Sequence, residues 1–238
     1  MDFASFALIS FMLLFGYTDG GMYMSMNHDM PMLQERGDVR LDFDLGCWNT
    51  TTSVAYAFGN HWGMQGALQC NIFGFSRYGG QLTAGWFPPL QGHSMVEVYG
   101  GASLGHIDMS HYGDFYDGTT QSYFVQADYA WCGLANSHID IGIGLKGGWL
   151  LGDITNTYTI WDELDERSVR RMQQQEYSEP FVEPTVVFRF GWERLKFNLN
   201  ASMTLSKDWG QFSNPEPRVG LGLNYYFHTA NKVEPGAY

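Results

Sequence analysis

Residues Leu195–Ser206 read Leu-Lys-Phe-Asn-Leu-Asn-Ala-Ser-Met-Thr-Leu-Ser, an alternation of apolar and polar side chains that holds for the whole stretch. A β-strand points successive side chains to opposite faces, so this segment has one apolar face and one polar face. Strands of soluble proteins average about five or six residues, whereas about 9–11 alternating residues cross a bilayer as a tilted strand. The stretch is therefore typical of a strand in a transmembrane β-barrel.

The same alternation recurs along the chain and predicts about ten strands. They are expected near residues 38–46, 50–58, 61–73, 80–87, 94–106, 121–131, 138–151, 181–191, 195–206 and 218–228. Short connections mostly alternate with longer ones, as in outer-membrane barrels, where periplasmic turns are short and extracellular loops are long. The expected fold is all-β, a transmembrane antiparallel up-and-down β-barrel. An even number of strands places both termini in the periplasm.

The 152–180 connection contains the one segment that favours a helix. Asp162–Arg167 carries acidic residues that suit a first helical turn, and Arg170 and Arg171 follow where the helix dipole prefers positive charge. The sequence predicts a short amphipathic helix in this extracellular loop. It is either a solvated loop helix or a lid or partner-docking element.

The N-terminal residues differ from the rest of the chain. Phe3–Phe15 is an apolar run too short to span a membrane as a helix, which predicts a signal peptide over residues 1–18. The alternative is a truncated or incorrectly assigned start. The expected organisation then continues with an N-terminal periplasmic segment (19–36), the barrel (37–228) and a periplasmic C-terminal tail (229–238).

Aromatic residues gather on the presumed outer face beside the short turns. Membrane barrels carry such girdles at the lipid–water interface, whereas a soluble lipocalin-like barrel, the main alternative, has no reason for one. The expected girdle consists of Tyr56, Phe58, Trp62, Trp86, Tyr129, Trp131, Phe190, Trp192, Tyr225 and Phe227.

The polar half of each strand is expected to face the lumen. Its charged residues are Arg40, Asp42, Asp44, Glu97, Asp128, Asp140, Lys146, Glu183, Arg189, Lys196 and Arg218. A charge-selective channel needs an open bore lined by one sign of charge. Here acids and bases nearly balance, and a ten-stranded barrel is only somewhat wider than an eight-stranded one, whose side chains fill it. We therefore expect paired charges that fill the lumen.

A polar cluster follows the fifth expected strand and includes His106, Asp108, His111 and Asp114. An Asp–His pair at a barrel rim suits a hydrolytic base, as in omptin-type proteases, and the same groups suit a divalent cation. Any exposed loop also has this composition. Sequence motifs of serine hydrolases, zinc proteases and phosphate-binding loops are absent. We expect no enzyme and no cofactor, with a rim hydrolase or metal-binding barrel as the lower alternative.

The net charge of −12 argues against nucleic acid as a partner, because nucleic acid requires a basic face. Three cysteines without paired spacing indicate packing rather than disulfides or zinc. The function expected from the filled lumen is a non-catalytic structural or accessory subunit of an outer-membrane assembly. A small porin for small solutes is the alternative.

Several motifs match a pattern of small outer-membrane proteins. Its N-terminal part, an aromatic residue, then Asn, Pro and Leu, then Glu-Lys-Gly-Glu, resembles Met22–Asn27, Met30–Leu33 and Glu35–Asp38. Later strands of the pattern resemble Ala55–Phe58 with His61, Val96–Gly101, Phe181–Pro184 and Phe188–Trp192. Together these segments resemble the small outer-membrane β-barrel proteins of the Bacteroidota. The resemblance implies a Gram-negative outer membrane and assigns no activity to particular residues.

The last strand carries a second resemblance. Arg218-x-Gly220-x-x-Leu223-x-Tyr225, with Phe227 beyond it, resembles the C-terminal signal that the barrel-assembly machinery recognises. Expected partners are therefore outer-membrane lipid, this machinery during insertion, and other outer-membrane or periplasmic proteins.

Overall fold

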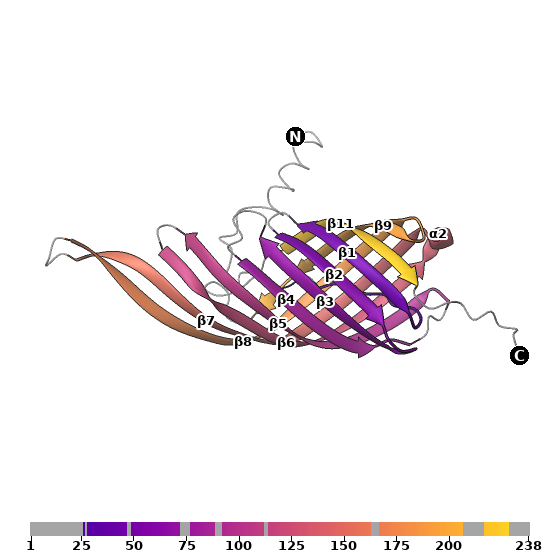
Figure 1. Ribbon diagram of the computed structural model, residues 1–238, viewed down its shortest axis with the longest axis horizontal. Coiled ribbons are helices and arrows are strands. Elements are labelled where there is room, and N and C mark those ends of the chain that lie inside the picture. Colours follow the sequence, from indigo (N-terminus) through magenta and orange to yellow (C-terminus); the bar gives the residue numbers. More distant parts are fainter. Residues whose placement is uncertain are drawn as a thin grey trace, which may run out of the picture.

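A computed structural model describes residues 26, 28–46, 49–71, 77–88, 92–111, 114–162, 167–206 and 217–228. The expected signal peptide (1–18) and C-terminal tail (229–238) lie outside the described residues. Nearly all described residues after Gly37 belong to antiparallel strands (Figure 1). Within the described ranges there is no helix long and apolar enough to cross a membrane.

The strands form one closed, ten-stranded, antiparallel up-and-down β-barrel, so the predicted fold class is confirmed. Neighbours in sequence are paired around the sheet, and β1 pairs with β11 to close it. The strands are β1 (Asp38–Gly46), β2 (Asn49–Ala57), β3 (Trp62–Asn71), β4 (Arg77–Trp86), β5 (Ser94–His111), β6 (Asp114–Gly133), β7 (Ile139–Asp162), β8 (Arg167–Gly191), β9 (Leu195–Met203), β10 (Leu205–Ser206) and β11 (Pro217–His228).

The segments β9 and β10 are one strand with an interruption at Thr204. The register against β8 continues unchanged, from Thr185 opposite Ser202 to Val182 opposite Leu205. In this register Thr204 lies opposite Glu183, next to Pro184, which has no backbone N–H to donate to a neighbouring strand.

Side-chain exposure alternates along the strands in the sense opposite to that of a soluble barrel. Leu68 and Leu82 are each 71% exposed on the outer face, whereas Gln69 and Gln81 are 2% and 3% exposed on the inner face. A protein in water would not present such a continuous apolar outer surface. The strand pattern therefore matches an apolar exterior and a polar interior.

The structure corrects the prediction for the 152–180 connection. Residues 139–162 and 167–191 form one long hairpin, and residues 167–172 pair in register with 157–162. The predicted helix is therefore wrong over 167–172, while residues 163–166 lie outside the described ones. Charge placement at a helix end contributes only about 0.3–1 kcal/mol, which strand pairing overcomes.

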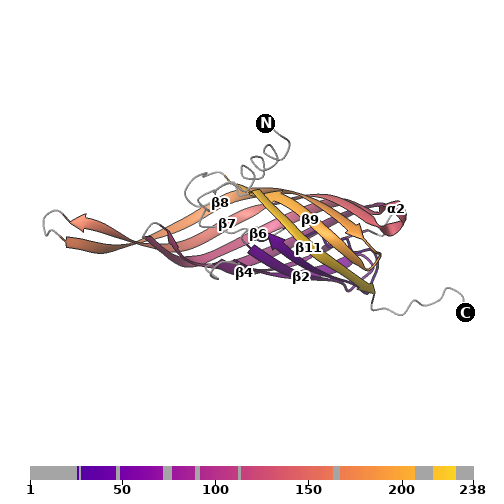
Figure 2. The same ribbon diagram turned by 90° about the horizontal axis from the view of Figure 1, so that it is seen from above.

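The barrel has two different ends. At one, here named the turn end, residues 58–61 and 192–194 and a short helix, α2 (Leu134–Ser137), connect strands. At the other, the hairpin end, β7 and β8 project beyond all other strands (Figures 1 and 2). Strand β1 begins at the turn end and β11 finishes there, because these two strands pair antiparallel from Asp38 to His228.

Candidate functional site in the barrel lumen

The lumen is occupied by the chain itself. Met26 and residues 28–34, together named the lumen segment, run through the barrel, and Met30, Met32 and Leu33 are completely buried there. Met26 lies beside Gly79, near the hairpin-end start of β4. Leu33 packs with Ala55, Ala57 and Phe87, near the turn end. The segment therefore enters at the hairpin end and leaves at the turn end.

This arrangement corrects the expectation of a periplasmic segment at 19–36. Its described residues up to Gln34 lie within the barrel, while residues 19–25 and Asn27 lie outside the description. Met26 and His228 also lie at opposite ends of the barrel, so the described chain does not start and finish on one side. The physical reason is that Met30, Met32 and Leu33 are apolar and gain from burial in the lumen.

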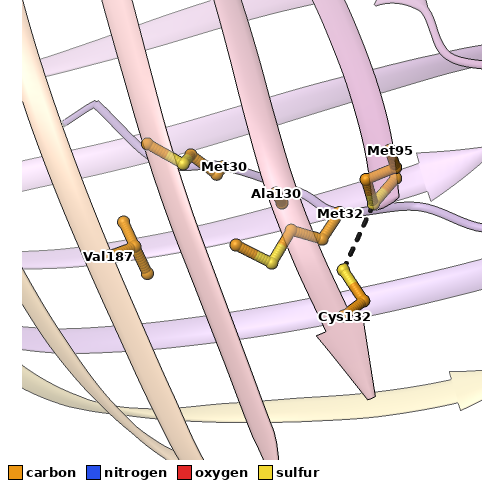
Figure 3. Close-up of a cluster of buried hydrophobic side chains, with 6 residues drawn as sticks. All are labelled: Met30, Met32, Met95, Ala130, Cys132 and Val187. Atoms are coloured by element: carbon orange, nitrogen blue, oxygen red, sulfur yellow. Dashed lines mark hydrogen bonds between the residues drawn. The ribbon is translucent and has the colours of Figure 1, made fainter. Parts of the chain in front are cut away.

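Small wall residues leave room for the lumen segment. Met30 and Met32 pack against Met95, Ala130, Cys132 and Val187, and Figure 3 shows both methionines crossing this part of the inner wall. Cys132 Sγ lies 3.3 Å from Met95 Sδ. The neighbouring wall position is Gly142, where a Cβ atom would lie 2.7 Å from Met30 Sδ and 2.7 Å from Met32 Cε. The wall and the segment are thus complementary in shape.

Filling this space should destabilise the barrel. We expect Gly142→Leu to lower the free energy of unfolding by about 1–3 kcal/mol, because the new side chain competes with Met30 and Met32 for the same volume. Adding Met32→Ala should restore part of the loss. The measurement is denaturant unfolding in lipid vesicles. Gly100→Leu is the matched control, because Gly100 is exposed on the outer face. Equal losses at the two glycines would contradict the packing described here.

Backbone N–H groups of the lumen segment are held by Glu97. The two carboxylate oxygens of Glu97 accept from Met32 N at 2.8 Å and from Leu33 N at 2.9 Å. Tyr99 donates its hydroxyl to the same carboxylate at 3.3 Å. An extended segment inside a lumen has no neighbouring strand for its N–H groups, so a wall carboxylate replaces one.

Asp29 is the polar centre of the segment. Its carboxylate accepts hydrogen bonds from the Ser53 hydroxyl and, at 2.6 Å, from Gln65 Nε2. It also lies 3.3 Å from Arg189 Nη2, which donates to Met30 O at 2.8 Å. Arg189 further lies 3.6 Å from Asp42 of the wall. One fully buried guanidinium therefore joins Asp29 and Met30 of the segment to Asp42 of the wall.

Two more contacts hold the hairpin-end half of the segment. His28 Nε2 lies 2.6 Å from Asp128 Oδ1. Lys146 Nζ donates to Met26 O at 2.9 Å and lies 3.5 Å from Glu183. Buried charges are stable only when they are paired and hydrogen-bonded, and Lys146 meets this condition through Glu183 and the segment's Met26 O.

The structure places the predicted lumen charges on the inner face. All are buried except Arg218, which is half-buried. Wall contacts outside the segment connect Lys196 to Asp140 (2.7 Å), Arg218 to Glu183 (3.8 Å), Asn198 to Asp44 (2.9 Å), Asn224 to Asp42 (2.7 Å) and Arg40 to Asn224 (3.4 Å). Sequence reasoning missed Asp29 and His28, which complete this network.

The predicted girdle residues lie on the outer face near the turn end. Most are exposed, and Tyr129 and Phe227 are half-buried. Phe190 stacks on Phe197 of the neighbouring strand, with ring centroids 5.4 Å apart. Tyr129 and Trp131 contact edge to face at 4.6 Å.

The predicted rim cluster is part of the β5–β6 hairpin rather than a loop. His106 Nε2 lies 3.7 Å from Asp117 Oδ1, and both side chains are partly or largely exposed. Asp108 is directly opposite Asp117 in the register. Within the described residues, His106, Asp108 and Asp114 do not gather as a set of metal ligands, and the side chain of His111 lies outside the description.

A different group of possible ligands lies where the lumen segment joins β1. Among the described residues, Glu35, Asp38 and His228 are the set whose ligand atoms lie within 4.8 Å of one another. Asp38 is already saturated, since it accepts from Gln34 N, Glu35 N, Tyr226 Oη and His228 Nδ1 at 2.7–2.9 Å. The group therefore fastens the segment to the first and last strands.

The turn into β1 depends on Gly37. Its φ of 91° is in the region that favours glycine, and its N–H donates to Ala57 O at 2.8 Å. This turn reverses the chain from the lumen into the wall.

Comparisons with known proteins give distant likenesses only. No protein-family model matches the chain, and no curated protein matches its sequence. The N-terminal β-barrel domain of Pseudomonas aeruginosa OprF is 12% identical, with 82% of this chain and 100% of that chain covered and a TM-score of 0.37. The KdgM porin is 12% identical, with coverage of 80% and 99% and a TM-score of 0.36. Ail, the attachment invasion locus protein of Yersinia pestis, is 13% identical, with coverage of 81% and 99% and a TM-score of 0.34.

Proposed function

We propose that this chain is a non-catalytic outer-membrane β-barrel whose lumen is closed by its own lumen segment. It serves as a structural or accessory subunit of an outer-membrane assembly. The observation that carries the proposal is the completely buried column of Met30, Met32 and Leu33, held by Glu97 and Arg189. A wall that binds part of its own chain this closely has little space for a substrate or a solute.

The membrane part of the proposal rests on the outer face. Leucines, valines and aromatic side chains are exposed there in every part of the barrel, and the polar side chains are turned inward. Closed barrels satisfy all backbone hydrogen bonds between strands, so they are stable in hydrocarbon. Outer-membrane lipid is therefore the partner proposed for this face, and the barrel-assembly machinery is the partner proposed for insertion through β11.

Orientation follows from the two ends. Short turns of outer-membrane barrels lie in the periplasm, so the turn end is proposed to be periplasmic and the hairpin end extracellular. His228 is then on the periplasmic side. Met26 is then near the cell surface.

Electrical recording tests the closed lumen. The full chain, reconstituted in planar bilayers, is expected to show no discrete conductance steps. A mobility difference between unheated and boiled samples in detergent gels serves as the check that the barrel is closed and folded. Regular conductance steps from folded protein would contradict the closed lumen and favour a small porin.

The subunit role is tested separately. Outer membranes solubilised in mild detergent should yield the tagged chain together with a reproducible partner. Consistent purification of the chain alone would count against a subunit, without affecting the closed lumen.

A small pore is the second candidate function. It is favoured by the polar wall behind the lumen segment, where Arg40, Lys146 and Glu97 line the barrel. If the segment left the lumen, this wall would surround a polar passage.

A further inference from the structure

Sulfur-containing side chains gather at one place in the barrel lumen. In the sequence, every second residue from 22 to 32 is methionine or histidine, and this stretch holds five of the twelve methionines of the chain. Two of them, Met30 and Met32, pack against Met95 and Cys132 of the wall. A thioether packs like other apolar groups, but its sulfur is also a donor atom for soft metal ions. The cluster therefore combines the ligands that such an ion prefers.

We propose that Cys132 and Met95 of the wall and Met32 of the lumen segment bind one soft monovalent metal ion, Cu(I). Cys132 Sγ lies 3.3 Å from Met95 Sδ. Two sulfur atoms that share an ion through bonds of about 2.3 Å, the length in zinc–thiolate sites, lie no more than about 4.6 Å apart. Figure 3 shows Met32 beside this pair, with Met30 further along the segment. Methionine is unbranched and flexible, so small shifts of its side chain admit the ion. The site uses the lumen segment, but it does not depend on whether the barrel conducts ions or belongs to an assembly.

The ion takes the place of a thiol proton. In the structure Cys132 donates its S–H to Met95 Sδ. Binding breaks this S–H bond and forms a bond between copper and Cys132 Sγ, because the thiolate is the form of cysteine that binds metals. Each thioether donates a lone pair, and copper stays in the +1 state. The proton leaves to the solvent together with the water that the ion sheds.

Charge balance selects a monovalent ion over a divalent one. A Cu(I) ion with one thiolate and two thioethers carries no net charge, so its burial avoids the cost of an unpaired charge. A divalent ion would keep one positive charge in a buried cluster that also contains Ala130 and Val187. Zinc takes its protein ligands from Cys, His, Asp and Glu, whereas thiolate and thioether ligands select Cu(I). The ligand set therefore favours copper in its +1 state.

Hydrogen bonds hold the backbone of the residues that supply the sulfur atoms. Glu97 accepts from Met32 N at 2.8 Å. Cys132 N donates to His93 O at 2.7 Å, and His93 Nδ1 lies 2.9 Å from Cys132 O. Groups that orient metal ligands in this way raise the affinity of a site. His93 is exposed just before β5 begins, so the site lies near the turn end of the barrel.

Titration with Ag(I) tests the ligands, because silver has the charge and ligand preference of Cu(I) and is stable in air. The full chain with Cys47→Ser and Cys70→Ser, folded in detergent, should bind one equivalent of silver nitrate in isothermal titration. Loss of a group that only orients a metal ligand costs about 10–100-fold in affinity, so Cys132→Ala and Met32→Leu should each weaken binding at least about tenfold. Met64→Leu is the matched control, because Met64 is exposed on the outer face and its replacement should leave the affinity unchanged.

Heat-dependent gel mobility shows whether each variant is folded. If Cys132→Ala does not fold, Met32→Leu alone decides, because it conserves side-chain volume. Equal affinities of the folded Met32→Leu and Met64→Leu variants would overturn the proposal, and so would a folded parent chain that binds no silver.

X-ray absorption tests the site with copper itself. The same chain, loaded anaerobically with one equivalent of Cu(I), should show only sulfur neighbours, at about 2.3 Å as in other metal–sulfur bonds. Met32→Leu should reduce the number of sulfur neighbours, and Met64→Leu should not. Nitrogen or oxygen neighbours in place of sulfur would overturn the proposal. Zn(II) that binds at Cys132 as tightly as Cu(I) would overturn the choice of a soft monovalent ion.

Discussion

A chain without residues 26–34 is expected to conduct ions across a lipid bilayer in discrete steps, whereas the full chain is expected to be silent. The deletion removes the buried column of Met30, Met32 and Leu33 from the lumen and leaves a polar wall. Charged wall side chains and a continuous bore are the requirements for ion conduction. Single-channel recording in planar bilayers is the measurement.

The remaining wall also predicts a weak preference for cations. Without Asp29, its buried acids are Asp38, Asp42, Asp44, Glu97, Asp128, Asp140, Glu179 and Glu183, and its bases are Arg40, Lys146, Arg189, Lys196 and the half-buried Arg218. The small excess of acids favours cations only slightly. The reversal potential in a salt gradient should therefore be small and of cationic sign.

Two controls keep this experiment decisive. Heat-dependent gel mobility shows whether the shortened barrel is folded. If it is not, a full-length variant with Met30, Met32 and Leu33 changed to serine replaces it, because the segment then loses its apolar packing but keeps its length. A folded variant that remains silent would mean that wall side chains alone close the lumen, contrary to the role assigned to the segment.

The strands of the membrane part could be predicted from the sequence because alternation decides the side each residue faces. Leu195–Met203 is a strand with Lys196 and Asn198 inside and Phe197 and Leu199 outside, as the pattern indicates. Placing apolar side chains on the lipid-facing side of the barrel lowers the free energy of every strand in the same way. Hence periodicity alone located all ten strands.

Periodicity failed at the projecting hairpin for a physical reason. Beyond the barrel, neither face of the strand is apolar, so residues 167–180 show no clear alternation. The acidic and basic residues there also suit a helix. Pairing with β7 decides the conformation, and pairing is not visible in a local window of sequence.

The lumen segment was missed because its environment is made by residues far away in sequence. Met30-Pro31-Met32-Leu33 shows no strand or helix period. The space that holds it depends on the small residues Gly142 and Ala130, about a hundred residues later, and its backbone is held by Glu97. A useful signal was present, because three apolar residues ahead of the first strand have no stable place in an exposed tail.

Arg189→Met is expected to destabilise the barrel by about 3–5 kcal/mol, the usual cost of removing one partner from a buried ion pair. Arg189 is completely buried and contacts Asp29 of the lumen segment and Asp42 of the wall. Methionine fills a similar volume but leaves both carboxylates without their cation and Met30 O without its donor. Denaturant unfolding from lipid vesicles, followed by tryptophan fluorescence, gives the free energy.

The matched control is Arg171→Met. Arg171 is exposed on the projecting hairpin, and its replacement should change the free energy of unfolding by less than about 0.5 kcal/mol. Similar losses at the two arginines would contradict the assigned network. A double variant, Arg189→Met with Asp29→Asn, should lose less than the sum of the single changes, because one buried charge is removed together with its partner. Strict additivity would mean that Arg189 stabilises the wall alone and that the segment is held by its apolar side chains and Glu97.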